Sequence, residues 1–375
     1  MPWSRFRRAS IATAIIGALF FGGAQQTSRE QLPPPQPEPV TSVNSQLTEL
    51  AAYINTLPGA DPDYTQLCLT PGATLGIVLF RQVHADPDET EMLRDIRRLG
   101  DELYAFHATA VHDELLLMTS MVQEDLASIV GDLSAHRGLR KVYTEGIAGN
   151  AIFSTPQDQV YWALGNVLDA GYMEFDAPCR HAVQYGFGTL LRPYLTADDR
   201  KDFDKLFARK KPVDMTCWDE IKYYPGATAL LALEGKIDEA PLEDEAVHRR
   251  ALDAYRKGDL TLAFAPREDA MIKRISDNET GIAYAVLGAD HALAGEVSCP
   301  GYVVMDRDTS GDNLEAWHAA GGRPISLLEV TPRILRDVSE QMAYDTMILR
   351  LLHDVVQTGK KYPLMTPDVD ELKPK

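Results

Sequence analysis

The feature that most constrains the fold is a series of short apolar runs separated by long helical stretches. Residues 74–80 (TLGIVLF) are continuously apolar and rich in β-forming side chains, the pattern of a strand buried on both faces. Further runs that read as strands, some of them weaker, lie at residues 140–144, 261–265, 282–287, 302–305 and 325–330. Each run is about as long as an ordinary strand and too short for a helix of average length.

Helical patterns occupy the segments between these runs. They cover residues 88–135, 158–206, 269–275 and 333–358. We expect the second of them to be interrupted at Gly171, at residues 186–188 and at Pro193. Strands that alternate with helices predict an α/β fold, in which a mostly parallel sheet is flanked by helices. The stretch of about 150–255 is then expected to be a helical insertion in this domain.

The N-terminus has the pattern of an export signal. Arg5, Arg7 and Arg8 precede an apolar stretch over residues 11–21, and small residues follow it up to Ala24. We expect residues 1–24 to be a signal peptide; the alternative is an uncleaved membrane anchor. A linker rich in Pro and Gln is expected over residues 25–45, and the α/β domain over 46–375. The destination is then the periplasm, the cell envelope or the exterior.

Charge and cysteine content bound the partners and the compartment. The formal net charge of −18 disfavours nucleic acid and anionic lipid as partners, so membrane contact is expected only if the signal stays uncleaved. Four cysteines permit two disulfides in an exported protein, and none of their spacings forms a C-x-x-C site. We expect at least one disulfide, with four buried thiols as the alternative.

Three predicted strand ends are each followed by a polar side chain that could carry chemistry. His84 follows the first strand, Glu145 follows the second, and His291 follows the strand at 282–287. In parallel sheets, sites form at the carboxyl ends of the strands, so these side chains are expected at one edge. Two imidazoles and a carboxylate could hold a divalent metal, or act as a base and its orienting partners. Taken singly, each histidine is more often a cap or a packing residue.

The residues around the strand at 282–287 favour a chemical role over a packing role for these side chains. Arg267-Glu268 with Met271, then Gly288-Ala289-Asp290-His291, resembles the carboxy-terminal part of the TraB/GumN and Tiki group. That group shares its fold with ChaN-like haem-uptake proteins and erythromycin esterases, and two Gly-x-x-His motifs mark it. The early motif would be Arg81-Gln82-Val83-His84, and Glu145 stands where the family has an acid.

The resemblance implies a hydrolase that cleaves a peptide or ester bond. Its substrate would be a small molecule or a peptide. His84, Glu145 and His291 would hold a divalent metal or activate water directly, and Arg267 would stabilise an anionic group or oxyanion. The alternative for Arg267 is a salt bridge to Glu268 or another neighbour. Arg81 stands where the family has a glycine. Its side chain would repel a cation and fill the space that a glycine leaves open. The alternatives are therefore a non-catalytic protein that binds haem, iron or a small ligand, or an envelope scaffold.

Other motifs carry weaker signals. His107 and His112 lie on different faces of a helix, and the histidine of Cys179-Arg180-His181 diverges from its thiol. Residues 306–312 mimic the start of a calcium loop, but the twelfth position is Trp317 instead of a bidentate Glu. The acids at 239–245 are expected to be a solvated face, although a short strand before them could present Glu243 or Asp244 to the site.

Overall fold

The structure of the protein is a computed structural model. The structure describes residues 42–83, 87–147, 155–169, 177–207, 214–255, 257–288, 291, 293–295, 299 and 313–359. The expected signal peptide and nearly all of the expected linker therefore lie outside the described residues, as do His84, the run at 302–305 and the calcium-like loop. Helix α1 (Val43–Ile54) begins inside the range that the sequence assigns to the linker, with Ser42 as its N-cap.

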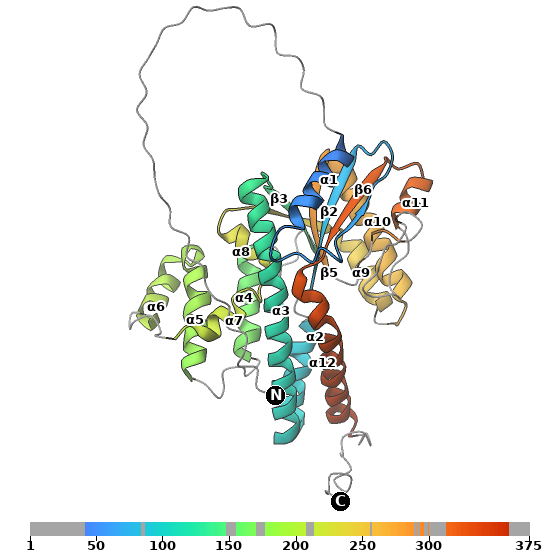
Figure 1. Ribbon diagram of the computed structural model, residues 1–375. Coiled ribbons are helices and arrows are strands. Elements are labelled where there is room, and N and C mark those ends of the chain that lie inside the picture. Colours follow the sequence, from blue (N-terminus) through green and yellow to red (C-terminus); the bar gives the residue numbers. More distant parts are fainter. Residues whose placement is uncertain are drawn as a thin grey trace, which may run out of the picture. The chain divides into compact units, whose positions relative to one another are not determined.

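A six-stranded, mostly parallel sheet organises the fold (Figure 1). Its strands are β1 (Gln66–Cys68), β2 (Leu75–Gln82), β3 (Lys141–Ile147), β4 (Asp238–Glu243), β5 (Gly281–Gly288) and β6 (Ile325–Val330). Their order is β1-β6-β2-β5-β3-β4, and only β1 pairs antiparallel to its neighbour. The predicted α/β class is confirmed.

Helices cover the sheet and extend beyond it. They are α2 (Pro87–Leu99), α3 (Glu102–His136), α4 (Pro156–Asp169), α5 (Ala177–Leu191), the 3-10 turn η1 (Arg192–Tyr194), α6 (Ala197–Phe207), α7 (Thr216–Ile221), α8 (Ala227–Leu233), α9 (Glu245–Tyr255), α10 (Leu260–Asn278), α11 (Asn313–Ala319) and α12 (Arg333–Thr358). The helices between β3 and β4 occupy most of the segment expected as an insertion. Figure 1 shows α2, α3 and α12 running together away from the sheet.

The apolar runs are buried on both faces because successive side chains of a strand point in opposite directions. In β2, Val78 and Phe80 pack in a cluster with α1, the second half of α3, and α8. Ile77 and Leu79 pack on the other face, in a cluster with α10 and α11. A third cluster joins α2, the first half of α3, α4, α5, α7 and α12. The first two clusters fix the strand ends that carry the candidate site.

Two expectations about helices are wrong. Residues 261–265 belong to α10, where the Asp259 side chain caps the helix by accepting a hydrogen bond from the Leu262 N–H. A five-residue apolar run fits a strand or a buried helix face equally well. Its apolar pattern therefore could not distinguish a strand from a helix. Gly186 and Gly188 do not interrupt α5, which continues to Leu191.

Both cysteine pairs form disulfides. Cys68 of β1 is bonded to Cys299, and Cys179 of α5 is bonded to Cys217 of α7. This confirms the expected bridge and is compatible with an exported protein. None of the described helices is both long enough and apolar enough to cross a membrane.

Candidate functional site

The carboxyl ends of three adjacent parallel strands form the candidate site. Strand β3 lies between β4 and β5, and Glu243 and Gly288 are the last residues of those two neighbours. The pairing of β3 with β4 shifts register between Thr144 and Ile147, and Glu145 lies inside this irregularity. Bulges of this kind redirect side chains at the ends of strands.

Glu145 is the centre of the hydrogen-bond network. Its Oε2 accepts from the backbone N–H of Gly288 at 2.9 Å. Its Oε1 accepts from Arg267 Nη2 at 2.7 Å and lies 3.2 Å from His291 Nε2. The side chain remains 15% exposed, so solvent reaches it. Glu145 thus connects β3, β5, α10 and the segment after β5.

His291 is buried between two carboxylates. Its Nδ1 lies 3.1 Å from Glu268 Oε1 and its Nε2 faces Glu145, while its ring packs edge-on against Phe264. Burial alone would lower the pKa of His291, but the charge of Glu145 and hydrogen bonds to Glu145 and Glu268 outweigh it and raise the pKa to about 9. At neutral pH the ring is therefore an imidazolium that donates from both nitrogens.

Arg267 lies beside Glu145 and is held by a second carboxylate. Its Nε donates to Glu243 Oε2 at 2.9 Å and its Nη2 to Glu243 Oε1 at 2.5 Å, a two-pronged contact of the kind that fixes guanidinium orientation. Burial opposes the charge of Arg267, but Glu145 and Glu243 raise its pKa above the ordinary value. Its Nη1 makes no hydrogen bond with any residue in the described part of the chain. The guanidinium can therefore still bind an added anion.

Helix α10 supplies three members of the site from one face. Phe264, Arg267 and Glu268 are three and four positions apart, which places them side by side on a helix. Glu268 is fully buried, and the side-chain amide of Asn313 at the start of α11 donates to its second oxygen. Glu268, itself held by Asn313, therefore fixes the ring of His291 in one orientation.

Glu268 and Asn313 were not predicted as site residues, and Glu243 was predicted only as the alternative to a solvated face. The favoured expectation for residues 239–245, a solvated face, is wrong for Glu243, whose side chain is 2% exposed. Burial would raise the pKa of Glu243, yet hydrogen bonds from His248 and Arg267 together hold it below the ordinary value. The spacing of Phe264, Arg267 and Glu268 was the signal that could have identified Glu268.

At the end of β2, the early motif carries a buried ion pair. Arg81 is fully buried, and its Nε donates to Glu329 Oε1 of β6 at 2.7 Å. Its Nη1 lies 3.5 Å from the Gly288 carbonyl oxygen. Glu329 balances the charge that was expected to repel a cation, but the arginine side chain does occupy the space that a glycine would leave open. His84, three residues on, lies outside the described residues.

The described members of the expected metal set do not fit a metal as they are arranged. Both ring nitrogens of His291 face carboxylates, whereas a metal ligand needs a nitrogen lone pair directed at the ion. The Glu145 oxygen nearest to His291 also accepts from the Arg267 guanidinium. Among the described residues, no group of three or more His, Cys, Asp or Glu side chains is arranged so that it could hold a metal ion. A protonated histidine and a guanidinium, both held by carboxylates, fit proton chemistry better.

The weaker motifs take other roles. Cys179 is in a disulfide and cannot act as a nucleophile. His112 is buried with its Nε2 3.2 Å from Thr90 Oγ1, whereas His107 is exposed on another face of α3. This agrees with packing roles and not with a shared metal.

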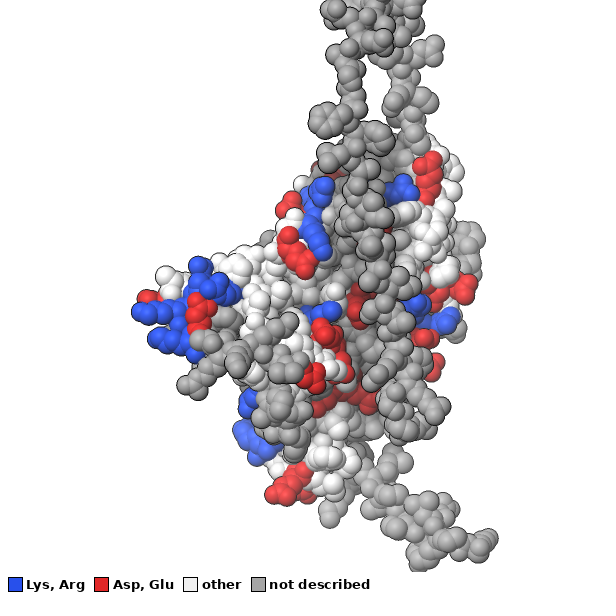
Figure 2. Space-filling model, turned by 60° about the vertical axis from the view of Figure 1, so that its left-hand side comes forward, with Lys and Arg blue, Asp and Glu red and all other residues white. Residues whose placement is uncertain are grey.

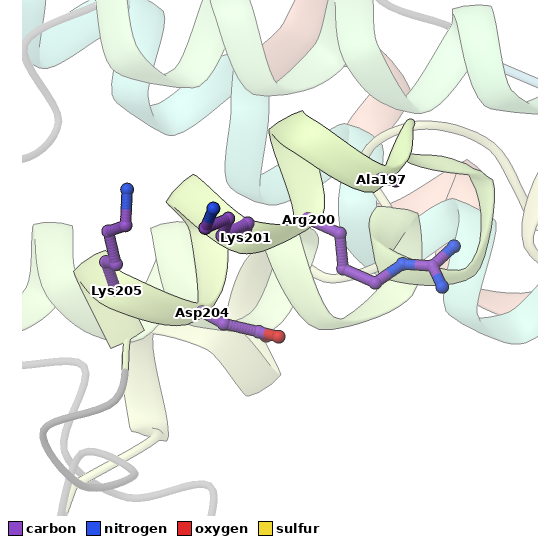
Figure 3. Close-up of a pocket in the computed structure, with 5 residues that line it drawn as sticks. All are labelled: Ala197, Arg200, Lys201, Asp204 and Lys205. Carbon is purple, nitrogen blue, oxygen red and sulfur yellow. The ribbon is translucent and has the colours of Figure 1, made fainter.

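Charged side chains on the displayed surface do not gather into a second candidate site. Figure 2 shows acidic and basic side chains interspersed on the face that it displays. A hollow of about 430 Å³ is lined, among the described residues, by side chains of α6 (Figure 3). The Arg200 guanidinium points away from Lys201 and Lys205 there and donates to the carbonyls of Pro193 and Leu195. These groups do not converge on one point.

Comparisons with protein-family models, curated proteins and solved structures found no match for this chain.

Proposed function

We propose that this protein is an exported hydrolase that cleaves a peptide or an ester with the side chains of Glu145, His291 and Arg267. One observation carries the proposal: a buried imidazole lies behind a carboxylate that solvent reaches, with a guanidinium beside it, at the carboxyl ends of parallel strands. Carboxylate, imidazole and guanidinium are groups that transfer protons and stabilise oxyanions.

Exposure suggests how the roles are divided. Glu145 and Arg267 are 15% and 13% exposed, whereas His291 is 2% exposed. Substrate can therefore touch the first two, and His291 acts through Glu145. We assign the contact with the attacking water to Glu145, and the contact with the developing oxyanion to Nη1 of Arg267, which has no hydrogen-bond partner among the described residues.

The proton balance follows from these assignments. Water bonds to the carbonyl carbon and gives its proton to Glu145, and the same proton then passes to the leaving oxygen or nitrogen as the scissile bond breaks. The charge of His291 holds Glu145 in place and limits how long it keeps that proton. Glu268 and Asn313 are positioning residues, since they fix the ring of His291. His84, which the resemblance places at the same edge, is a candidate second base.

The experiment uses the mature chain and a panel of nitrophenyl esters and fluorogenic peptides. We expect turnover of at least one class, and a loss of about 100-fold or more in kcat for Glu145→Gln, the range typical of a lost acid–base group. Glu49→Gln, on the exposed surface of α1, is the control and should keep full activity. Added chelator should leave the rate unchanged. Equal rates for both variants would exclude the proposed role of Glu145.

A second candidate is a binding protein of the same fold that takes up haem, iron or a small ligand without chemistry. The buried Arg81–Glu329 pair favours it, because it fills the place where the related family has glycine. In that case the panel shows no turnover, and haem added to the protein gives a Soret band that His291→Ala shifts or removes. A band that is unchanged in His291→Ala would count against coordination at this edge.

A further inference from the structure

A cavity of about 520 Å³ lies between α3, α5, α7 and α8, outside the sheet-edge site. Lys236, on its wall, comes just before β4, whereas Glu243 of the sheet-edge site ends the same strand. The two sites therefore lie toward opposite ends of β4. The volume lies within the range of cavities that bind small organic ligands. The lining is about half polar, with Leu190, Leu230 and Leu231 beside two aromatic rings and with acidic and basic side chains at other positions.

The Trp218 wall of this cavity is rigidly held. Cys217, the preceding residue, is bonded to Cys179 of α5. The indole lies so close to the backbone of α5 that a Cβ at Gly186 would overlap it, and it packs edge-on against Phe187 with ring centroids 4.8 Å apart. Gly186 thus permits the indole to lie against the helix. A ring fixed in this way loses little conformational entropy when a ligand binds.

Three polar groups on the cavity wall have no partner in the described part of the chain. They are the indole N–H of Trp218, the hydroxyl of Tyr223 and the carboxylate of Glu124, for which no described residue provides a hydrogen bond or ion pair. Trp218 and Tyr223 are half-buried and Glu124 is exposed at the mouth of the cavity, and a few polar groups of this kind give a ligand pocket its specificity. The cavity therefore offers both an apolar body and polar contacts.

The charges indicate the sign of the ligand. Glu234 pairs with Lys236 at 2.6 Å, and Lys222 lies 3.9 Å from Asp219 and above the Tyr223 ring. The lining thus holds two carboxylates and two ammonium groups, of which Glu124 is the one without an ion pair in the described part of the chain. Burial raises the pKa of Tyr223, and the charges of Glu124, Glu234 and Asp219 raise it further, as expected where the potential is negative.

We propose that this cavity binds a small organic amine, whose apolar body packs on Trp218 and whose ammonium group pairs with Glu124. Aromatic faces attract cations in addition to apolar groups, so Trp218 and Tyr223 suit such a ligand in both respects. A carboxylate ligand would meet the charge of Glu124 and should be rejected. The proposal is independent of the reaction at the sheet edge.

Calorimetric titration of the mature chain tests the proposal with three matched probes: phenethylamine, phenethyl alcohol and phenylacetate. We expect the amine to bind at least about fivefold more tightly than the alcohol, and phenylacetate to bind most weakly, from one charge-assisted hydrogen bond. Glu124→Gln should remove the advantage of the amine and leave binding of the alcohol unchanged. Glu114→Gln, which makes the same charge change on an exposed position of the same helix, should have no effect.

Three results would overturn the proposal: no saturable binding of the amine, equal affinity for amine and phenylacetate, or equal behaviour of the Glu124 and Glu114 variants. Glu145→Gln provides the link to the sheet edge. Amine binding that survives in Glu145→Gln assigns the site to the helical cavity, whereas binding that is lost there assigns the amine to the sheet-edge site and refutes the proposal.

Discussion

Arg267 shows how single residues hold the candidate site together. Two carboxylates from different strands, Glu145 and Glu243, share its guanidinium, and Glu243 is almost fully buried. Removing one member of a buried ion pair leaves an uncompensated charge in a poorly solvated place. An exposed pair between Glu245 and Arg249 lies two residues further along the chain, so both environments can be compared directly.

We expect Glu243→Gln to lower the free energy of unfolding by about 3 kcal/mol, because the charge of Arg267 loses its two-pronged partner. Glu245→Gln, in the exposed pair, should change it by less than about 1 kcal/mol. Urea unfolding of both variants measures the difference. Equal effects of the two substitutions would mean that the Glu243 contact is not a buried ion pair in solution.

Gly186 shows how a glycine can be required for a steric reason. Gly186 lies inside α5, where the indole of Trp218 leaves no room for a Cβ, whereas Gly165 in α4 has nothing within 4 Å of that position. Gly186→Ala should therefore destabilise the protein by about 1–3 kcal/mol through overpacking. Gly165→Ala should stabilise it by about 0.5–1 kcal/mol, since alanine favours helix over glycine. Thermal unfolding that moves the same way in both variants would contradict the packing of Trp218 on α5.

At the scale of elements, Gln123 of α3 joins three parts of the fold. Its Nε2 donates to Gln82 Oε1 at 3.0 Å and to the Val83 carbonyl at 2.6 Å, just after β2. Its Oε1 accepts from the Ala227 N–H at the start of α8. The residue is almost completely buried, so water could not take over its hydrogen bonds if the side chain were removed. Gln123 thus fixes the chain just before His84.

Gln123→Leu should lower the free energy of unfolding by about 2–4 kcal/mol, because buried donors and acceptors lose their partner. Gln357→Leu, at an exposed position of α12 where the amide donates to Asp95, should cost less than about 0.5 kcal/mol. Chemical denaturation provides the measurement. A small effect at Gln123 would show that the end of β2 is held by other contacts.

Elements were predictable where one period dominated. The runs that became β2, β3, β5 and β6 were each located, and α12 was predicted with its observed ends, 333 and 358. The run at 261–265 was not, because Asp259 starts a helix there and tertiary packing decides between two equally compatible periods. The three-residue β1 and the polar edge strand β4 carried no clear apolar signal.

At the scale of the molecule, the expectation that sites form at the carboxyl ends of parallel strands correctly placed Glu145 and His291 together, although they are 146 positions apart in the sequence. The rule works because it depends on topology alone. Glu268 and Asn313 were missed because only the packing of α10 and α11 against the sheet makes them neighbours of His291. Glu243 was placed at the site only as an alternative, because a run of acids normally indicates solvent exposure.

The charge on His291 has a consequence for the whole molecule. Because its pKa is raised from 6.5 to about 9, the folded protein binds this proton more tightly than the unfolded chain does. The stabilisation is therefore complete below about pH 6.5 and is lost as the pH rises through 9. Glu145→Gln removes the main source of the raised pKa but leaves the ring buried.

The most direct test of the central claim, that Glu145 and His291 form one proton-holding unit, is an NMR titration of the His291 imidazole in the wild type and in Glu145→Gln. We expect a pKa of about 9 in the wild type and a clearly lower value in the variant, since the burial that lowers the pKa remains. A wild-type pKa at or below 6.5, or one that does not change in Glu145→Gln, would contradict the claim.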